Sequence, residues 1–402
     1  MKDALESKVN QKNRRRTLGA ASTIHFLHDG FSDLLYLLLP VWQAEFALSL
    51  SQVGVIKGGF SGAMALGQIP LGLVAERFGE RLLLALGTVT IGLAYMVLGA
   101  TGGFLTLIAV LLVAGLGAAV QHPLCSSVVA KDYEEDGRRL ALGIYNFAGD
   151  LGKMVVPALA ALVVAAFGWR WAAVGYGFIG VLAGIAVFVV LGMLGVGLRP
   201  RHREGGTQAS TGWGIRQPIG FSVLSAIGIL DGGTRTAFLT LLPFLLIGKG
   251  ADIKTIGGAL ALVFAGGAAG KFLCGALAQR IGIVRTVVLS EVVTGGGILL
   301  LLDLPLRGAL ALLPLVGLGL NGTSSVLYAT VADFVDSEKR SRGFALFYTL
   351  GIGAGAVAPF IFGVLSDFAG IETALTVVVG CVLMTVPLSI MMRGPLASEG
   401  AS

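Results

Sequence analysis

The chain has 402 residues, of which 55% are hydrophobic and only 13% are charged. Soluble domains carry about 25% charged residues, so this chain has too little charge to cover a water-soluble protein of its length. Its 61 glycines also exceed the usual share of ~7%. These figures exclude a disordered chain, a coiled coil and collagen, and they argue against nucleic-acid binding. They predict a polytopic membrane protein.

Three cysteines, at positions 125, 274 and 381, lie in apolar runs. Their odd number and wide spacing indicate neither a disulfide framework nor a metal site, and we expect no cofactor and no resident metal. The first sixteen residues are polar and basic. The apolar run after them is too long for the core of a signal peptide, so we expect no cleavable signal.

Apolar runs separated by charged or Gly/Pro-rich segments predict twelve transmembrane helices, because a bilayer core needs about 20 apolar residues per helix. In the first half the expected spans are 18–46, 53–75, 82–100, 104–130, 140–167 and 171–194. In the second half they are 218–247, 256–278, 284–302, 306–332, 344–368 and 373–392. We expect an all-α membrane protein with six-helix bundles at 1–198 and 216–402, joined by a flexible cytoplasmic linker at 199–215.

The distribution of positive charge predicts the orientation. Of the 29 Lys and Arg residues, 21 lie on the side of the N-terminus, four on the opposite side and four within spans. Cytoplasmic loops carry the excess of Lys and Arg, so both termini are expected in the cytoplasm. The net charge of +6 is therefore a topology signal rather than a surface for polyanions. We expect a monomer embedded in the lipid bilayer of a bacterial-type inner membrane.

The two halves of the chain repeat in a constant register. The matched pairs are Asp29 and Asp231, Pro157 and Pro359, and Gly168 and Gly370, all 202 residues apart, with Gly79 and Gly282 at 203. A register shared by several spans is hard to obtain by chance, even in a Gly-rich chain. It predicts two pseudo-symmetric bundles related by an axis along the membrane normal, which is a parallel-repeat transporter architecture.

One short segment resembles a family signature. The run Gly72-Leu-Val-Ala-Glu76-Arg77-Phe-Gly79-Glu80-Arg81 is similar to the loop between the second and third spans of the major facilitator superfamily. That family usually has Asp where this chain has Glu76, and a basic residue where it has Glu80. The resemblance implies a latch at the cytoplasmic ends of the bundles, near the start of the eleventh span at Arg342. Its expected residues are Gly72, Glu76, Arg77, Gly79, Arg81 and Arg280.

Within that superfamily, the first half most resembles the fosmidomycin-resistance type of efflux transporter. The resemblance rests on the runs His25-Phe-Leu-His28-Asp29, Gln121-His122-Pro123 and Asn146-Phe-Ala-Gly149-Asp150. The chain departs from that type at His28, where Asn is commoner, and at Asp150. The resemblance implies export of a small organic molecule.

The first predicted span carries a polar stripe. Its members are His25, His28, Asp29, Ser32, Asp33 and Tyr36. Steps of three and one place all six on one helical face. Charges at mid-bilayer cost several kcal/mol unless they face a cavity or a partner, so we interpret the stripe as the lining of a central aqueous cavity. The alternative is interhelical hydrogen bonding that only holds spans together.

Other spans also carry buried polar groups. Asn146, Asp150 and Lys153 share one face of the fifth span, where Asp150 and Lys153 either neutralise each other or take part in transport. Asp231 and Arg235 in the seventh span leave the same two alternatives open.

The remaining candidates are Gln121, His122, Lys271 and Glu291. Pro123 should loosen the helix next to Gln121 and His122. Lys271 occupies the register of Gln68 and is expected to reach the cavity. Glu291 lies in a span that is peripheral in the family, which favours a structural role.

These groups suggest how transport is coupled. Asp29 and Asp33, then Asp231, are the expected proton-binding carboxylates, because desolvation and pairing change a carboxyl group's affinity for protons. The histidines at 25, 28 and 122 can relay protons. Lys153 and Arg235 can hold an anionic group of the substrate. Competition between proton and substrate for the acids would give antiport.

We therefore predict a secondary transporter that exports a small organic molecule by proton antiport and alternating access. Proton-coupled uptake of an organic anion is one alternative. Export of a metal or metal chelate is another, since the first-span histidines and aspartates are metal-ligating types. An enzyme is disfavoured, because the chain has no HExxH, GxSxG or phosphate-loop motif.

Overall fold

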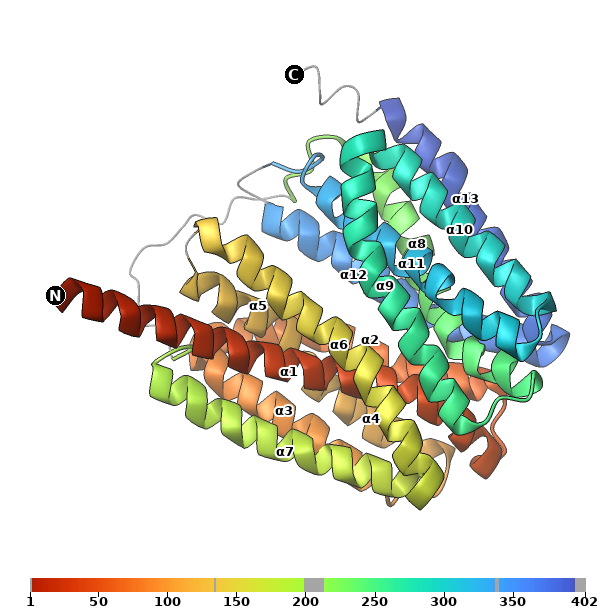
Figure 1. The fold of residues 1–402 in the computed structure, drawn as a ribbon, viewed down its shortest axis with the longest axis horizontal. Coiled ribbons are helices and arrows are strands. Elements are labelled where there is room, and N and C mark those ends of the chain that lie inside the picture. Colours follow the sequence, from red (N-terminus) through yellow and green to blue (C-terminus); the bar gives the residue numbers. More distant parts are fainter. Residues whose placement is uncertain (1, 134, 199–212, 337–339, 395–402) are drawn as a thin grey trace. The chain divides into compact units, whose positions relative to one another are not determined.

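The computed structural model describes residues 2–133, 135–198, 213–336 and 340–394. These residues form thirteen α-helices (Figure 1). The first seven are α1 (Lys2–Phe46), α2 (Leu50–Phe78), α3 (Glu80–Leu98), α4 (Phe104–Ala118), α5 (Gln121–Asp132), α6 (Glu135–Phe167) and α7 (Trp169–Leu194). The others are α8 (Pro218–Gly248), α9 (Ile253–Ile281), α10 (Ile283–Asp303), α11 (Leu306–Val331), α12 (Arg340–Ala369) and α13 (Ile371–Met391). The predicted linker at 199–215 lies outside the described residues up to position 212.

Among the described residues, eleven helical segments are long and apolar enough to cross a membrane. They correspond to the predicted second to twelfth spans, with α4 and α5 forming the single segment Phe104–Asp132. The first predicted span lies in α1 and is not among the eleven, because its histidines and aspartates lower its mean hydropathy. The prediction of an all-α membrane fold is confirmed.

The fourth predicted span is broken between α4 and α5, at residues 119–120. Pro123 explains the break, because its nitrogen has no hydrogen to donate to the carbonyl of Ala119 and its ring crowds that carbonyl. The loosening predicted next to Gln121 and His122 is therefore present. It sets the start of α5 at Gln121, and His122 follows directly.

Four glycines confirm the internal repeat in the backbone. Gly79 and Gly282 precede α3 and α10 with φ of 90° and 87°. Gly168 and Gly370 precede α7 and α13, both with φ of 86°. With ψ between 150° and 161°, all four lie in a region that is essentially restricted to glycine. These are the pairs matched in the sequence, so each half turns into its third and sixth span by the same glycine-dependent corner.

The chain divides into two compact units. The first unit comprises Met1–Leu35 and Ala63–Gly205, and the second comprises Tyr36–Gly62 and Gly206–Ser402. Residues 36–62 join the second unit because the start of α2 packs against α12, where Asp367 accepts hydrogen bonds from the backbone of Leu50 and Ser51 at 2.7 and 2.9 Å. The units thus differ from the predicted bundles at 36–62, and the bundle boundaries stay a prediction.

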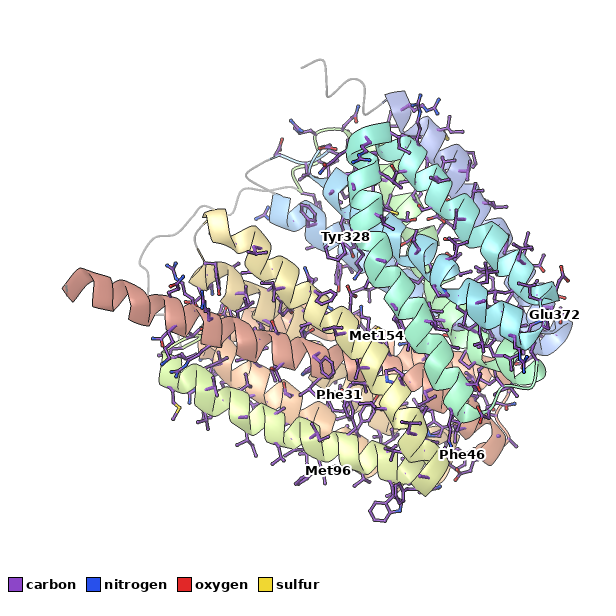
Figure 2. All side chains as sticks on the ribbon, viewed as in Figure 1. Phe31, Phe46, Met96, Met154, Tyr328 and Glu372 are labelled. Carbon is purple, nitrogen blue, oxygen red and sulfur yellow. The ribbon has the colours of Figure 1, made fainter. Side chains whose placement is uncertain are left out.

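In the first unit α3 and α7 lie side by side (Figure 1). Two tyrosines from these helices hold α1: the hydroxyl of Tyr95 donates to the carbonyl of Phe31, and that of Tyr176 donates to the carbonyl of Leu27. The ring of Phe31, labelled in Figure 2, is fully buried, with its centroid 4.6 Å from that of Tyr95 and 4.3 Å from that of Tyr176. This face of α1 is therefore packed in the hydrophobic core of the first unit.

Candidate functional site

The carboxylate of Asp29 is the centre of a buried charged cluster in the first unit. Its side chain is 6% exposed. Oδ2 lies 3.2 Å from Lys153 Nζ and 3.3 Å from His25 Nε2, and Oδ1 lies 3.6 Å from His122 Nε2. With Asp150 these residues form what we call the Asp29 cluster, which joins α1, α5 and α6. Five predicted site residues are therefore brought together.

The hydrogen bonds of His25 define which ring nitrogen carries hydrogen. Its Nδ1 lies 2.8 Å from the carbonyl oxygen of Tyr145, which can only accept, so Nδ1 is the donor. In the neutral ring, Nε2 then presents a lone pair to Asp29 Oδ2. Two acceptors 3.3 Å apart repel unless a proton lies between them. This pair is therefore suited to binding a proton.

Tyr145 supports the site and was not predicted from the sequence. Its ring stacks on His25 with centroids 4.2 Å apart, and its hydroxyl accepts a hydrogen bond from Gln121 Nε2 at 2.8 Å. Gln121 is fully buried. The one available signal was the position of Tyr145 one helical turn before Gly149. Because its contacts depend on packing between helices, spacing alone did not reveal it.

Gly149 provides the space for the cluster. A Cβ atom at this position would lie 2.5 Å from His25 Nε2 and 2.6 Å from Asp29 Oδ2. Such distances are far below van der Waals contact, so a side chain here would displace the two polar groups. The absence of a side chain therefore lets α6 approach α1 at the charged pair.

Lys153 is shared by two carboxylates. Its ammonium is 3.2 Å from Asp29 Oδ2 and 3.7 Å from Asp150 Oδ1. The predicted pair within α6 is thus present, but the shorter contact reaches across to α1. Asp33, also buried, acts on the ammonium through its charge. The side chain of Lys153 is 29% exposed, so the cluster is not sealed.

His28 lies apart from the cluster although it shares the polar stripe. Its Nε2 is 2.9 Å from Thr88 Oγ1, whose hydrogen is donated to the carbonyl of Leu84. Thr88 therefore accepts from His28, which leaves His28 Nδ1 as a bare acceptor. That atom is buried and has no hydrogen-bond partner among the described residues. The stripe thus divides between a charged side toward α6 and a packed side toward α3.

A second charged pair lies in the second unit. Arg235 is 4.0 Å from Asp231, one turn away on α8. Three phenols, those of Tyr36, Tyr328 and Tyr348, act electrostatically on the guanidinium.

Two further predicted residues lie on α9 and α6. Lys271 is half-buried on α9, where its carbonyl accepts from Ser325. Asn146 is exposed on α6.

Five of the predicted latch residues lie at the end of α2, in the turn after it or at the start of α3, and Arg280 lies on α9 of the second unit. Gly72, Glu76 and Arg77 are exposed or half-exposed on α2, and Arg280 is exposed on α9. Glu80 rather than Glu76 makes the ion pair here, with Lys131 of α5. These residues stay predictions for the latch.

Arg81 is held within the first unit. Its Nε donates to the carbonyl of Phe188 at 2.8 Å, and its guanidinium lies 3.9 Å from the centroid of that ring. Arg81 therefore joins the start of α3 to the end of α7.

The Asp29 cluster also contains a metal-like donor set. His25, Asp29 and His122 present ligand atoms within 4.8 Å of one another. Two imidazoles and a carboxylate are a common set for divalent transition metals. The ammonium of Lys153 at the same carboxylate opposes a second cation by Coulomb repulsion. The donors therefore fit a metal, and the ammonium counts against one.

Comparisons with known proteins show which family this chain resembles. The model of the Major Facilitator Superfamily matches residues 21–223 and 224–399. The probable sulfoacetate transporter of Cupriavidus necator is 25% identical over 412 residues, covering 96% of this chain and 95% of that protein. The fosmidomycin resistance protein of Escherichia coli is 29% identical over 189 residues, covering 46% of this chain and 44% of that protein.

A solved structure of a bacterial homologue of the human lysosomal transporter Spinster, inward-facing and occupied, has the same fold. It matches with a TM-score of 0.81 at 16% identity and covers 96% of this chain and 98% of that chain. The sequence resemblance to the superfamily is thus confirmed over nearly the whole length. The chain belongs to the Major Facilitator Superfamily and is a multi-pass membrane transporter rather than an enzyme.

Proposed function

We propose that this transporter moves a small organic anion together with protons, and that the Asp29 cluster binds both. The position of Lys153 is the main support for this proposal, because its ammonium is shared between Asp29 at 3.2 Å and Asp150 at 3.7 Å. An ammonium is a strong donor to carboxylate and sulfonate oxygens. Whatever weakens its bond with Asp29 makes it available to a substrate.

Protonation of Asp29 has that effect. A proton bound between Asp29 and His25 removes the negative charge that holds Lys153. The ammonium then keeps only its more distant carboxylate partner and can bind an anion. Proton and anion therefore favour each other's binding, and the preference is reciprocal by thermodynamic linkage. Such a site moves the two in the same direction.

His122 supports a route for the proton. Its Nε2 is 3.6 Å from Asp29 Oδ1, and its side chain is 30% exposed, whereas His25 and Asp29 are about 5% exposed. An imidazole gains and loses a proton near physiological pH. His122 thus connects the buried pair with solvent, and the buried pair holds the proton.

The substrate class is small carboxylates and sulfonates. A full-length relative is a probable sulfoacetate transporter, and sulfoacetate carries both groups. The excess of Lys and Arg on the side of the N-terminus supports cytoplasmic termini, and an inner membrane with an acidic outer side would then drive uptake. We propose that a single chain carries out transport as a monomer.

Proton-driven export is the second candidate. The fosmidomycin resistance protein, which is similar to 46% of this chain, supports it. In that case the substrate would bind to the ionised Asp29 or Asp33, and an incoming proton would displace it. The two candidates differ in the direction in which protons move relative to substrate.

Liposomes that contain the protein and a trapped pH indicator separate the candidates. Sulfoacetate, other organic acids, drugs and divalent cations are added outside without an imposed pH gradient, and the membrane potential is clamped. Cotransport predicts that the lumen becomes acidic as an anion enters, whichever way the protein is inserted. An alkaline lumen would indicate antiport, and entry of a divalent cation in place of an anion would indicate metal transport. Either result would contradict anion–proton cotransport.

A further inference from the structure

Glu291 is a buried carboxyl group in the second unit. It belongs neither to the Asp29 cluster nor to the Asp231–Arg235 ion pair. It lies in the middle of α10 and is 3% exposed. Its side chain forms hydrogen bonds with Thr323 of α11 and Thr385 of α13, and it acts electrostatically on Asp231 and Arg235 of α8. The sequence favoured a structural role for this residue. That role stays a prediction, and the structure adds that Glu291 interacts with the Asp231–Arg235 pair.

The hydroxyl of Thr385 can only accept from Glu291. A hydroxyl has one hydrogen, and Thr385 donates it to the carbonyl oxygen of Val382 at 2.5 Å. The remaining interaction of Thr385 Oγ1 with the carboxyl group therefore needs a hydrogen on Glu291. A carboxylate has none, whereas a carboxylic acid has one.

A second hydroxyl chain leads to the same result. Ser290 donates to the carbonyl oxygen of Val287 at 3.0 Å, and Thr323 Oγ1 lies 2.6 Å from Ser290 Oγ and 3.3 Å from the carbonyl oxygen of Gly319, so Thr323 donates its hydrogen to one of these two oxygens. The hydrogen of Thr323 is thereby used, and only its oxygen faces Glu291. Both hydroxyl partners of this carboxyl group are therefore acceptors.

The charges around Glu291 also balance only when a proton is bound. Arg235 is the cation of this group and already has Asp231 as its counterion at 4.0 Å. A second ionised carboxyl group would leave one buried negative charge uncompensated, which is strongly unfavourable. One proton shared by the two acids restores neutrality. The groups that face Glu291 are Asp231 and Arg235 of α8, Cys274 of α9, Thr323 of α11 and Thr385 of α13.

We propose that Glu291 is a second proton-binding site, protonated at neutral pH, which shares the single counterion Arg235 with Asp231. This goes beyond the proposed coupling at Asp29, because it places a bound proton in the other compact unit. It also makes a prediction about charge exchange: when Asp231 loses its charge, Glu291 becomes the counterion of Arg235 and releases its proton.

Infrared difference spectroscopy of the substrate-free protein tests this without transport. The spectrum of wild type minus Glu291→Gln should contain the carbonyl stretch of a protonated carboxyl group at neutral pH. The control Glu372→Gln changes an exposed acid at the start of α13 (Figure 2) and should give a carboxylate band instead. In Asp231→Asn the protonated band of Glu291 should be replaced by a carboxylate band.

Three results would overturn the assignment. One is a carboxylate band from Glu291 in the wild type. Another is a protonated band that persists in Asp231→Asn. The third is failure of Glu291→Gln to fold, because Gln keeps the shape and one donor of the neutral acid and should be tolerated. Since no substrate is added, these outcomes are independent of whether Asp29 couples transport.

Discussion

His25 and Asp29 lie one turn apart on α1 and present Nε2 and Oδ2 to each other at 3.3 Å. The other nitrogen of His25 donates to the carbonyl of Tyr145, so a proton between the two side chains completes the contact. Lys153 and His122 reach the same carboxylate from α6 and α5. The buried carboxylate is therefore a shared partner of a proton, an ammonium and an imidazole.

Asp29→Asn should abolish the coupling of transport to protons but leave substrate exchange intact. The amide cannot bind the proton, while Lys153 keeps Asp150 and can still bind an anion. We expect gradient-driven accumulation to fall about tenfold or more, which corresponds to about 1.4 kcal/mol of lost coupling. Exchange of labelled for unlabelled substrate without a gradient should continue. Accumulation equal to that of the control Glu372→Gln would show that Asp29 does not couple transport.

Lys153 and Asp29 should be energetically coupled. Lys153→Gln leaves the buried carboxylate of Asp29 and the partly buried carboxylate of Asp150 without their ammonium, and removing one partner of a buried pair costs about 3 kcal/mol or more. Adding Asp29→Asn should recover part of this loss, with a coupling energy of roughly 1–3 kcal/mol. Thermal or denaturant unfolding of the four proteins in the cycle measures it. Strictly additive effects would mean that the 3.2 Å contact contributes nothing.

Gly149→Ala should disrupt the Asp29 cluster. Its Cβ would lie 2.5 Å from His25 Nε2, and overpacking of this kind costs about 1–3 kcal/mol. We expect lower stability and loss of proton-coupled accumulation. Gly143→Ala on the same helix is the matched control, because a Cβ there has nothing within 4 Å. Equal behaviour of the two variants would refute the packing argument.

Gly370→Ala should destabilise the second unit through backbone strain alone. A Cβ at Gly370 meets nothing within 4 Å, but φ is 86°. A non-glycine residue in this region costs about 1–3 kcal/mol. Gly380→Ala, within α13 and equally unobstructed, should instead be neutral or stabilising by up to about 1 kcal/mol. The unfolding temperature should therefore fall for Gly370→Ala and stay unchanged or rise for Gly380→Ala, and an equal fall in both would contradict the prediction.

Asp252, which precedes α9, should make the stability of the folded protein depend on pH. Hydrogen bonds from the hydroxyl and backbone N–H of Thr255 hold the pKa of Asp252 below its usual 3.8. Since folding lowers this pKa, its stabilisation is complete above the unfolded-state value and is lost as pH falls through the folded-state value. The stability of wild type relative to Asp252→Asn should thus decrease below about pH 4. A difference that does not change with pH would contradict this.

Helical periodicity and the repeat predicted much of this molecule. The faces that carry Asp29 and Lys153, the glycine corners and the break at Pro123 all follow from local sequence chemistry. Partners contributed by distant helices did not, since His25 and Tyr145 are 120 positions apart. The surroundings of Glu291 likewise depend on which helices enclose α10, and periodicity does not give them. Asn146 shares a face with Asp150 yet is exposed, because periodicity fixes a face but not how far a neighbouring helix extends along it.

The most direct measurement is the proton change that accompanies anion binding. Purified, substrate-free protein is mixed with sulfoacetate in weakly buffered solution containing a pH indicator. If the anion and Asp29 compete for Lys153, binding must take up protons from solution, and Asp29→Asn must abolish that uptake. Proton release on binding, or undiminished uptake by Asp29→Asn, would contradict coupling through this carboxylate.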